Sequence, residues 1–274
     1  MAISLNTQGA SLSALRNLGT SLKGFGASLS RLASGSRITK AADDAAGLAI
    51  SQQLAASLHT TSRAEQNIRD AGSALFQADG AIAQAQSISG RLAELALQSA
   101  NGTYSTEQRA ALQSEFSSLT QEIQRISETT QFNGQQLLDG SSLSVQVGTD
   151  GGSNSTLQVG GVDVKGLAAQ LSSQNIGTQA GGQAAIDAVR QFSEQRVSQR
   201  AAGIGAAYNR LESIAQTLDA RRSAESGALS RIRDADVAEE TAKLSQNQIL
   251  SQAGVSVLAQ ANRLNSVSVK LLLG

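Results

Sequence analysis

Residues 12–32 are LSALRNLGTSLKGFGASLSRL, and they decide the fold because their large apolar side chains recur with helical spacing. Gaps of three and four residues separate these side chains, which is typical of a heptad seam. The seam consists of Leu12, Leu15, Leu18, Leu22, Phe25, Leu29 and Leu32. Mostly small, polar or basic residues lie between them, so one narrow face is apolar and the predicted helix needs a partner.

This N-terminal segment is not expected to fold alone. The conformational entropy lost by ordering about thirty residues exceeds the free energy that burial of their large apolar side chains contributes. Backbone hydrogen bonds and packing against partner helices could reverse that balance. We therefore expect a terminus that is disordered in isolation and folds when it assembles.

Composition favours long, uninterrupted helices. The 274 residues include no proline, cysteine or tryptophan and one histidine, although average usage would give roughly fourteen prolines. Charge is segregated, because residues 1–42 contain five basic and no acidic side chains and residues 241–274 contain three basic and no acidic ones. Since the formal net charge is zero, the interior is acidic. The two ends therefore form one chemical class and the interior another.

The acidic interior is predicted to begin with a long helix. After a polar break, Asp43 and Asp44 stand at the start of an Ala-rich stretch, where acidic side chains complement the helix dipole. Apolar positions continue with helical spacing to about Ser99. Ser105 and Gln108 then have the spacing of a capping box, which predicts a second helix that returns antiparallel to the first.

The middle of the chain has a different texture, with eleven glycines between Gly134 and Gly182. The run Leu143–Val147 alternates with period two and further short runs follow, so we expect one small β-hairpin within about 141–165. A Gly-rich loop is expected after it. From Gln183 the helical pattern resumes, which predicts the third helix of a bundle. Its apolar positions seven residues apart are Val197, Ile204, Leu211 and Leu218.

The last segment carries a second seam. After a break at Asp234–Asp236, apolar residues recur seven apart. They are Leu250, Val257, Leu264 and Leu271. A row of small residues flanks them and would let another helix approach closely. This row consists of Gly254, Ala261 and Ser268. Because both ends carry such seams, we expect the two termini to pair with each other.

These patterns predict a mainly α fold, a long antiparallel coiled-coil helix bundle with paired N- and C-terminal helices and one small β-hairpin. Residues 1–42 and 235–274 are expected to form a terminal coiled-coil assembly domain. Residues 43–234 are expected to form a rod-like helical bundle domain that carries the hairpin.

Signals for catalysis or cofactor binding are weak. His59 has no clustered second ligand, so a solvated or bundle histidine is favoured over a metal site. Gly203 and Gly205 lack the third glycine and the preceding strand of a dinucleotide site. The absence of cysteine excludes disulfides and thiolate chemistry. We predict no enzyme activity, no cofactor and no metal.

The basic ends suggest three other possible functions. The basic, acid-poor start would suit a transit peptide, although the C-terminus has the same character. Basic apolar ends would also suit an amphipathic-helix lipid-surface protein. Nucleic acid is disfavoured, because a leucine seam through the basic ends argues for helix partners instead. Neither an apolar run of about eighteen residues nor a secretory signal segment is visible.

Seven segments resemble bacterial flagellin in sequence, order and spacing. They are LNT (5–7), SLSRLASG (28–35), DDAAGLAIS (43–51), ELALQSAN (94–101), TQFNG (130–134), SRIRDAD (230–236) and QILSQAG (248–254). The resemblance covers about 1–138 and 183–274. Larger flagellins insert outer variable domains in the middle, where this chain has only the hairpin segment. The chain therefore resembles a short flagellin with core domains only.

This resemblance implies a structural subunit of the bacterial flagellar filament, used for swimming motility. It implies unfolded export through the flagellar type III channel without a cleaved signal peptide, and an extracellular location in the filament. The implied partners are further copies of the chain, the flagellar cap and hook-junction proteins, and an export chaperone at the C-terminal segment. The hook-filament junction protein has similar ends and is the alternative within this class.

The resemblance also implies a candidate contact with an innate immune receptor, Toll-like receptor 5. The arginine, leucine and glutamate of the family's receptor-binding motif match Arg91, Leu95 and Glu115. Gly90 and Ala93 depart from the motif, which more often has Gln and Arg at these positions.

Overall fold

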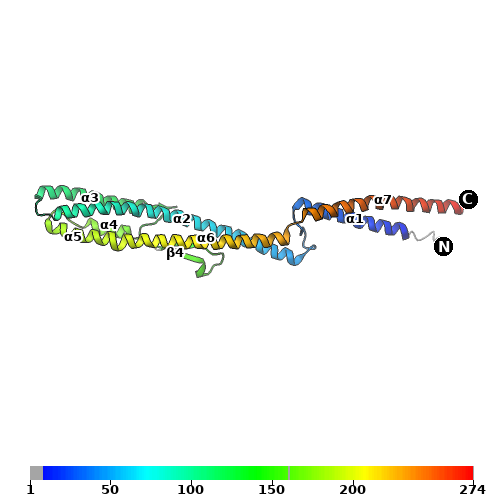
Figure 1. Cartoon of the computed structure of the whole chain (residues 1–274), viewed down its shortest axis with the longest axis horizontal. Helices are drawn as coiled ribbons and strands as arrows, with labels where there is room; N and C mark the ends of the chain where they lie inside the picture. The colour runs from blue at the N-terminus through cyan, green and yellow to red at the C-terminus, as the bar shows by residue number, and fades with distance from the viewer. Residues whose placement is uncertain (1–8, 160, 274) are drawn as a thin grey trace. The chain divides into compact units, whose positions relative to one another are not determined.

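The computed structural model describes residues 9–159 and 161–273, with side chains except at 10, 167, 194–196, 198, 200 and 264–273 (Figure 1). The helices are α1 (Gly9–Ser34), α2 (Ala45–Ala100), α3 (Thr106–Thr129), α4 (Val164–Ser172), α5 (Gln179–Arg190), α6 (Ser198–Arg233) and α7 (Val237–Leu273). The strands are β1 (Gln131–Phe132), β2 (Gln135–Gln136), β3 (Leu143–Gln146) and β4 (Thr156–Val159). A short 3-10 helix, η1 (Ser153–Ser155), precedes β4, and a π-helical stretch, η2 (Gln191–Val197), precedes α6. The predicted mainly α fold is confirmed.

The chain divides into two compact units, which are described separately. One joins the start of the chain, as far as Ala56, to the part from Ala224 onward, and the other comprises Ser57–Ser223. Helices α2 and α6 contribute residues to both units. The domain boundaries expected from the sequence lie elsewhere, at the breaks near residues 42 and 235. The division into an assembly domain and a rod domain stays a prediction.

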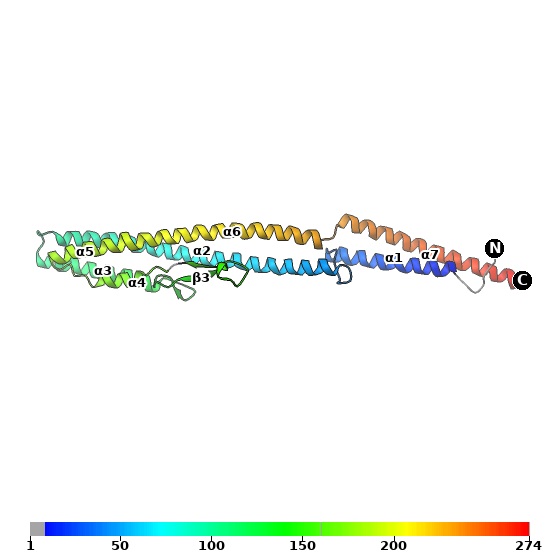
Figure 2. The same ribbon diagram turned by 90° about the horizontal axis from the view of Figure 1, so that it is seen from below.

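Helices α1 and α7 lie side by side and antiparallel in the first unit (Figures 1 and 2). The two chain breaks in this unit are joined by hydrogen bonds. Arg37 N donates to Arg233 O at 2.6 Å, and Ala235 N donates to Gly35 O at 3.0 Å. The Arg37 guanidinium also donates to the carbonyl oxygen of Ile232 at 2.8 Å. Pairing of the termini is therefore supported by pairing of the segments that lead into them.

Capping side chains set the starts of three helices. Asp44 Oδ1 accepts from Gly47 N at 2.8 Å at the start of α2. Asp236 Oδ1 accepts from the backbone N–H groups two and three residues further on, at the start of α7. Ser105 and Gln108 form the reciprocal capping box of α3. The predicted helix starts at Asp44 and Ser105 are confirmed.

The second unit contains a continuous apolar core, to which its long helices contribute. Its largest fully buried side chains include Ile82, Leu92, Leu95, Phe116, Ile123, Leu138, Leu171 and Ile176. The predicted seven-residue repeat leading into α6 points into this core. Its members Val197, Ile204, Leu211 and Leu218 are all buried. The sequence periodicity thus identified the core face of the third long helix correctly.

The segment between α3 and α4 contains two hairpins rather than one. The expected hairpin is formed by β3 and β4, which pair antiparallel with Leu143 opposite Val159. A second hairpin, β1 with β2, reverses at Asn133 and Gly134, whose φ angles are 50° and 82°. Positive φ at both central residues is the requirement of a type I′ turn, for which Asn-Gly is the preferred pair.

The sequence predicted extended chain at Val162–Val164 and then a Gly-rich loop, and this is wrong in part, because the helix α4 begins at Val164. Asp163 Oδ1 accepts from Gly166 N at 2.7 Å and caps the short helix α4. Val164, Ala168 and Leu171 follow at helical spacing and are buried, because α4 packs on α3. The sequence showed a short alternating run at Val162–Val164, and the capping role of the aspartate between the two valines was missed.

Replacing Leu95 by alanine should lower the free energy of unfolding by about 2–5 kcal/mol, because this side chain is fully buried in the core. Leu97 provides the matched control, since it lies on the same helix with 59% of its surface exposed. Leu97→Ala should change stability by no more than about 0.5 kcal/mol. Urea unfolding followed by circular dichroism checks both, and equal effects would contradict the assigned core.

Candidate assembly interface

Helix α1 turns different residues toward α7 and toward solvent. Its buried positions carry small side chains, which are Ser11, Ala14, Ser21 and Ser28. A row of half-buried residues borders them, consisting of Leu18, Phe25 and Leu32. A second row remains 51–53% exposed, and we call it the outer leucine row; its members are Leu12, Leu15, Leu22 and Leu29. The seam predicted as one stripe is therefore divided between a face within the chain and a free face.

Helix α7 is divided in the same way. The residues that are half-buried against α1 are spaced by three and four and include Leu244, Asn247, Ser251, Gly254, Leu258 and Ala261. Leu250 and Val257, expected as assembly residues, lie outside this face and are about half exposed. The side chains of Leu264 and Leu271 lie outside the described residues.

Small residues let the two helix backbones approach closely. A Cβ on Gly24 would lie 2.9 Å from the side-chain nitrogen of Asn247, so α7 fills the space that a larger residue would need. On the other helix, a Cβ on Gly254 would lie 3.5 Å from Leu18 Cδ1. A Cβ at Gly254 would make only ordinary van der Waals contact with Leu18, so the close approach expected there stays a prediction. On α1, small residues are therefore the ones buried in the contact with α7, whereas the outer leucine row stays exposed.

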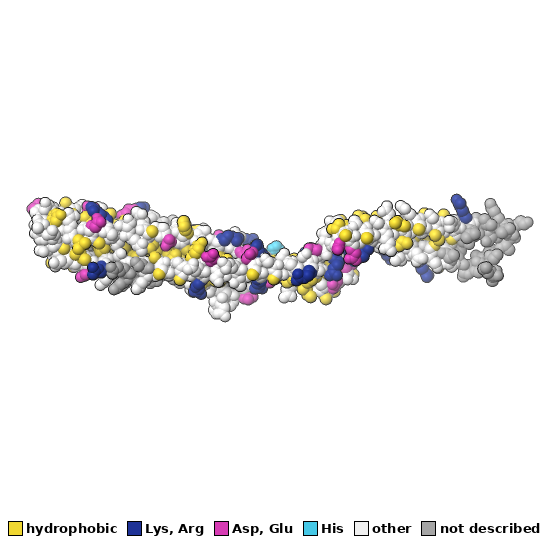
Figure 3. Space-filling model, in the orientation of Figure 1, with side chains coloured by type: hydrophobic (Ala, Val, Ile, Leu, Met, Phe, Trp, Pro, Cys, Tyr) yellow, Lys and Arg dark blue, Asp and Glu magenta, His cyan; other side chains and the backbone are white. Residues whose placement is uncertain are grey.

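Apolar side chains are exposed among polar ones on the outer surface of the α1–α7 pair (Figure 3). Besides the outer leucine row, its exposed large apolar side chains are Val237, Ile249, Leu250, Val255 and Val257. Single exposed apolar residues are ordinary, but a gathered set marks an interaction surface. This surface is the candidate functional site.

A buried carboxylate lies within the α1–α7 pair. Glu240 is 4% exposed, and Arg31 Nη1 donates to its Oε1 at 3.1 Å. Lys243 Nζ lies 3.4 Å from the same oxygen. Burial opposes ionisation, but hydrogen bonds from Ser28 and Arg31 and the charge of Lys243 outweigh it and hold the pKa of Glu240 below its ordinary value. Glu240 was not predicted as a special residue from the sequence, although it is an acid in the first turn of a helix whose chain end is otherwise basic.

The candidate receptor residues are placed differently from one another. Arg91 Nε donates to Glu115 Oε1 at 2.9 Å, and Arg91 Nη1 donates to Glu94 Oε2 at 2.9 Å. Both partners of the Arg91–Glu115 pair are about half exposed. Leu95 is fully buried in the apolar core. The structure thus brings Arg91 and Glu115 together at the surface, whereas Leu95 packs inside.

Other kinds of site find little support in the described part of the chain. His59 is exposed, and no group of three or more potential metal ligands occurs among the described residues. Within residues 9–159 and 161–273, no helix combines the length and apolar character needed to cross a membrane.

Comparison with known proteins agrees with this picture. Residues 5–143 match the bacterial flagellin N-terminal helical region, and residues 185–272 match the bacterial flagellin C-terminal helical region. The chain belongs to the bacterial flagellin family. A flagellin from Halalkalibacterium halodurans is 38% identical over 263 residues, which cover 95% of this chain and 96% of that protein. The resemblance inferred from seven short segments is therefore confirmed.

Two further relatives bear on the fold and on the assembly. The flagellar filament 30.7 kDa core protein of Treponema maltophilum is 31% identical over 278 residues, covering 94% of this chain and 95% of that protein. The crystal structure of Bacillus cereus flagellin has a TM-score of 0.50 at 26% identity, covering 56% of this chain and 88% of that chain. Because the alignments with the Halalkalibacterium and Treponema proteins cover nearly all of both chains, these relatives have about the same length as this chain.

Acid should loosen the α1–α7 pair. Since the pKa of Glu240 is lower in the folded chain than its ordinary value of about 4.5, its charge contributes stability above that value. The contribution is lost as the pH falls through the folded pKa. Hydrogen exchange should therefore show weaker amide protection in α1 and α7 in acid, and Glu240→Gln should reduce this pH dependence. Glu239→Gln, at the exposed neighbouring position, is the control that should retain it.

Proposed function

We propose that this chain is a structural subunit of the bacterial flagellar filament and polymerises through the outer faces of its terminal helices. The observation that carries the proposal is the outer leucine row, which stays exposed although α1 already has a partner helix. The names of the relatives, flagellins and a flagellar filament core protein, support the same function.

Energetics favour a polymer over an isolated pair of copies. Covering the exposed half of the four outer leucines would contribute roughly 3–6 kcal/mol, at about 1.5–3 kcal/mol for each fully buried side chain. Association costs about 4–15 kcal/mol in lost translational and rotational freedom. One such contact is therefore weak, and stable assembly requires each copy to touch several neighbours, as it does in a helical polymer.

The chemistry of the two outer faces supports an open assembly. The exposed apolar residues of α1 are leucines in one row, whereas those of α7 are mainly valine and isoleucine beside Leu250. In a filament, α1 of one copy would contact α7 of the next without a reciprocal contact between the same two copies, which makes the contact heterologous. A heterologous contact that does not close into a ring propagates into a helical filament. The lipid-surface alternative gives no comparable reason for two different outer faces.

The export route, location and partner proteins that the family resemblance implies are part of the same proposal. They include unfolded export through the flagellar type III channel, an extracellular location, and the cap, hook-junction and export-chaperone partners. The seams at both ends support a terminal region that becomes fully ordered on assembly. The absence of cysteine is compatible with export, since no disulfide chemistry is needed afterwards.

A contact with an innate immune receptor is a second proposal. It is supported by the half-exposed Arg91–Glu115 pair, which joins the two matched charged residues on neighbouring helices. Leu95 would act from inside by fixing the position of Arg91, four residues earlier on α2. The departures at Gly90 and Ala93 lead us to expect binding weaker than that of a flagellin with the full motif.

Assembly should fail when charge is placed on an outer face. Leu22→Asp and Val257→Asp each introduce a carboxylate where the proposal buries an apolar side chain, and should abolish filaments while preserving the helical signal of the monomer. Thr20→Asp is the matched control, because Thr20 lies on the exposed polar side of α1.

Negative-stain electron microscopy of seeded or salted-out protein distinguishes the outcomes. Filaments from wild type and Thr20→Asp alone support the proposal. Undiminished filaments from both outer-face variants would refute it, and recruitment of a non-assembling wild type to lipid vesicles would favour the lipid-surface alternative.

A further inference from the structure

Phe76 is the most exposed large apolar side chain among the described residues, with 80% of its surface accessible. It lies on α2 in the second unit, and so belongs to a different unit from the terminal helices that carry the proposed polymer contacts. Its neighbour Leu75 is buried in the core, so the exposure is not caused by a loose helix. A phenylalanine offers a large apolar surface, so one that is four-fifths exposed on a well-packed helix is available for contact with another molecule.

The phenyl ring of Phe76 projects from α2 between two positions that have no side chain, and we call it the Phe76 knob. Gly72 and Gly80 lie one turn before and one turn after it, on the same side of α2. A Cβ built on either glycine would meet nothing within 4 Å. Neither glycine is therefore required by packing within the chain, although glycine is less favourable than alanine inside a helix. Bare backbone on both sides leaves room for another molecule to close around the ring.

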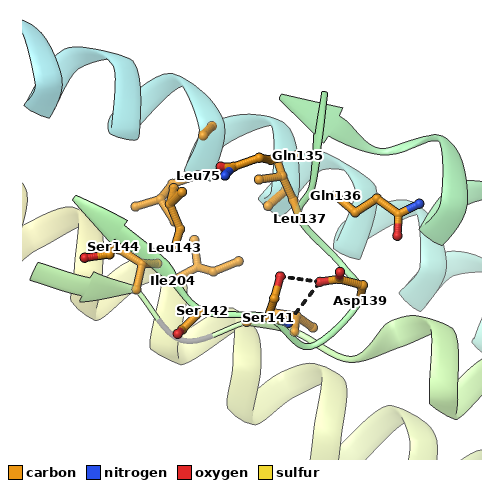
Figure 4. Close-up of a pocket in the computed structure, with 15 residues that line it drawn as sticks. Leu75, Gln135, Gln136, Leu137, Asp139, Ser141, Ser142, Leu143, Ser144 and Ile204 are labelled. Atoms are coloured by element: carbon orange, nitrogen blue, oxygen red, sulfur yellow. Dashed lines mark hydrogen bonds between the residues drawn. The ribbon is translucent and has the colours of Figure 1, made fainter. Parts of the chain in front are cut away.

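A cavity of about 430 Å³ lies on a different side of the same turn of α2 (Figure 4). Its apolar lining includes Leu75, Leu143 and Ile204, and its polar lining includes two glutamines and three serines. Asp139 also lines it and accepts hydrogen bonds from the backbone and hydroxyl of Ser141. Asp139 is the single charged residue among those that line it. An apolar lining with mostly uncharged polar groups suits an uncharged ring.

We propose that Phe76 of one copy inserts into this cavity of a neighbouring copy in the filament. This inference rests on the proposed filament function and adds a contact to it. Phe76 cannot fill the cavity of its own chain, because successive helical residues are 100° apart and Ala78, which lines the cavity, therefore faces away from it. A knob and a complementary cavity on different sides of one chain form a heterologous contact, which repeats from copy to copy without closing.

The first test removes the ring. Phe76→Ala should raise the critical concentration for seeded filament growth about tenfold, which corresponds to about 1.4 kcal/mol per subunit. Phe76→Leu should give an intermediate value, because it restores part of the apolar volume. The thermal unfolding of the monomer should not change, since the side chain is exposed. An unaltered critical concentration for Phe76→Ala, measured beside wild-type filaments, would overturn the inference.

The second test detects the contact directly, and it uses the absence of native cysteine. Gly80→Cys places a thiol one turn from Phe76, and Ser142→Cys places one in the cavity lining. Filaments of the double variant, treated with a short bis-maleimide, should give a ladder of covalent multimers on a denaturing gel. Gly80→Cys combined with Ser118→Cys, on exposed α3 surface, should give none.

The outcomes separate this inference from the proposed function. If wild-type protein forms no filaments, or if the outer-face variants assemble normally, the proposed function fails first. If filaments form and depend on the terminal helices, but the Gly80→Cys and Ser142→Cys pair gives no more ladder than its control, the inference about Phe76 alone fails.

Discussion

The pairing of α1 with α7 depends on how little bulk lies between the two helices. Serine, alanine and glycine occupy the contact, so the backbones approach closely and no leucine needs to be fully buried there. Interiors reach high packing density by matching volumes, and here the match is made with the smallest side chains. The leucines that remain outside are then available to other molecules. Fold and assembly are thus assigned to different residues of one short helix.

Much of the architecture could be predicted because it follows from local chemistry. The capping box at Ser105, the helix start at Asp44 and the seven-residue repeat from Val197 each act within one or two turns of helix, and each is confirmed. The Asp163 cap of α4 was missed, because the valines on either side of it alternate as they would in a strand. A short apolar run does not distinguish a strand from a helix start by periodicity alone.

The candidate interface was only partly predictable for a different reason. A heptad seam identifies which residues lie on a broad apolar side of a helix, but it does not say which part of that side faces which partner. Leu15 and Leu18 have the same chemistry and neighbouring positions, yet one is exposed and the other half-buried. Only the position of α7 separates them. In the same way, the sequence shows the glycines on either side of Phe76, but the exposure of its ring depends on the long-range packing of α2.

The small residues of α1 have one more consequence, which concerns register. Ala14, Ser21 and Ser28 are seven apart and nearly equal in size, so this row by itself does not fix the position of α1 along α7. The pair between Arg31 and Glu240 helps to fix it. A slide by seven residues would place Gly24 or Ile38 where Arg31 lies, and Glu240 would keep only Lys243 of its own helix as a charged partner. One charged pair therefore aligns a helix whose packing surface repeats.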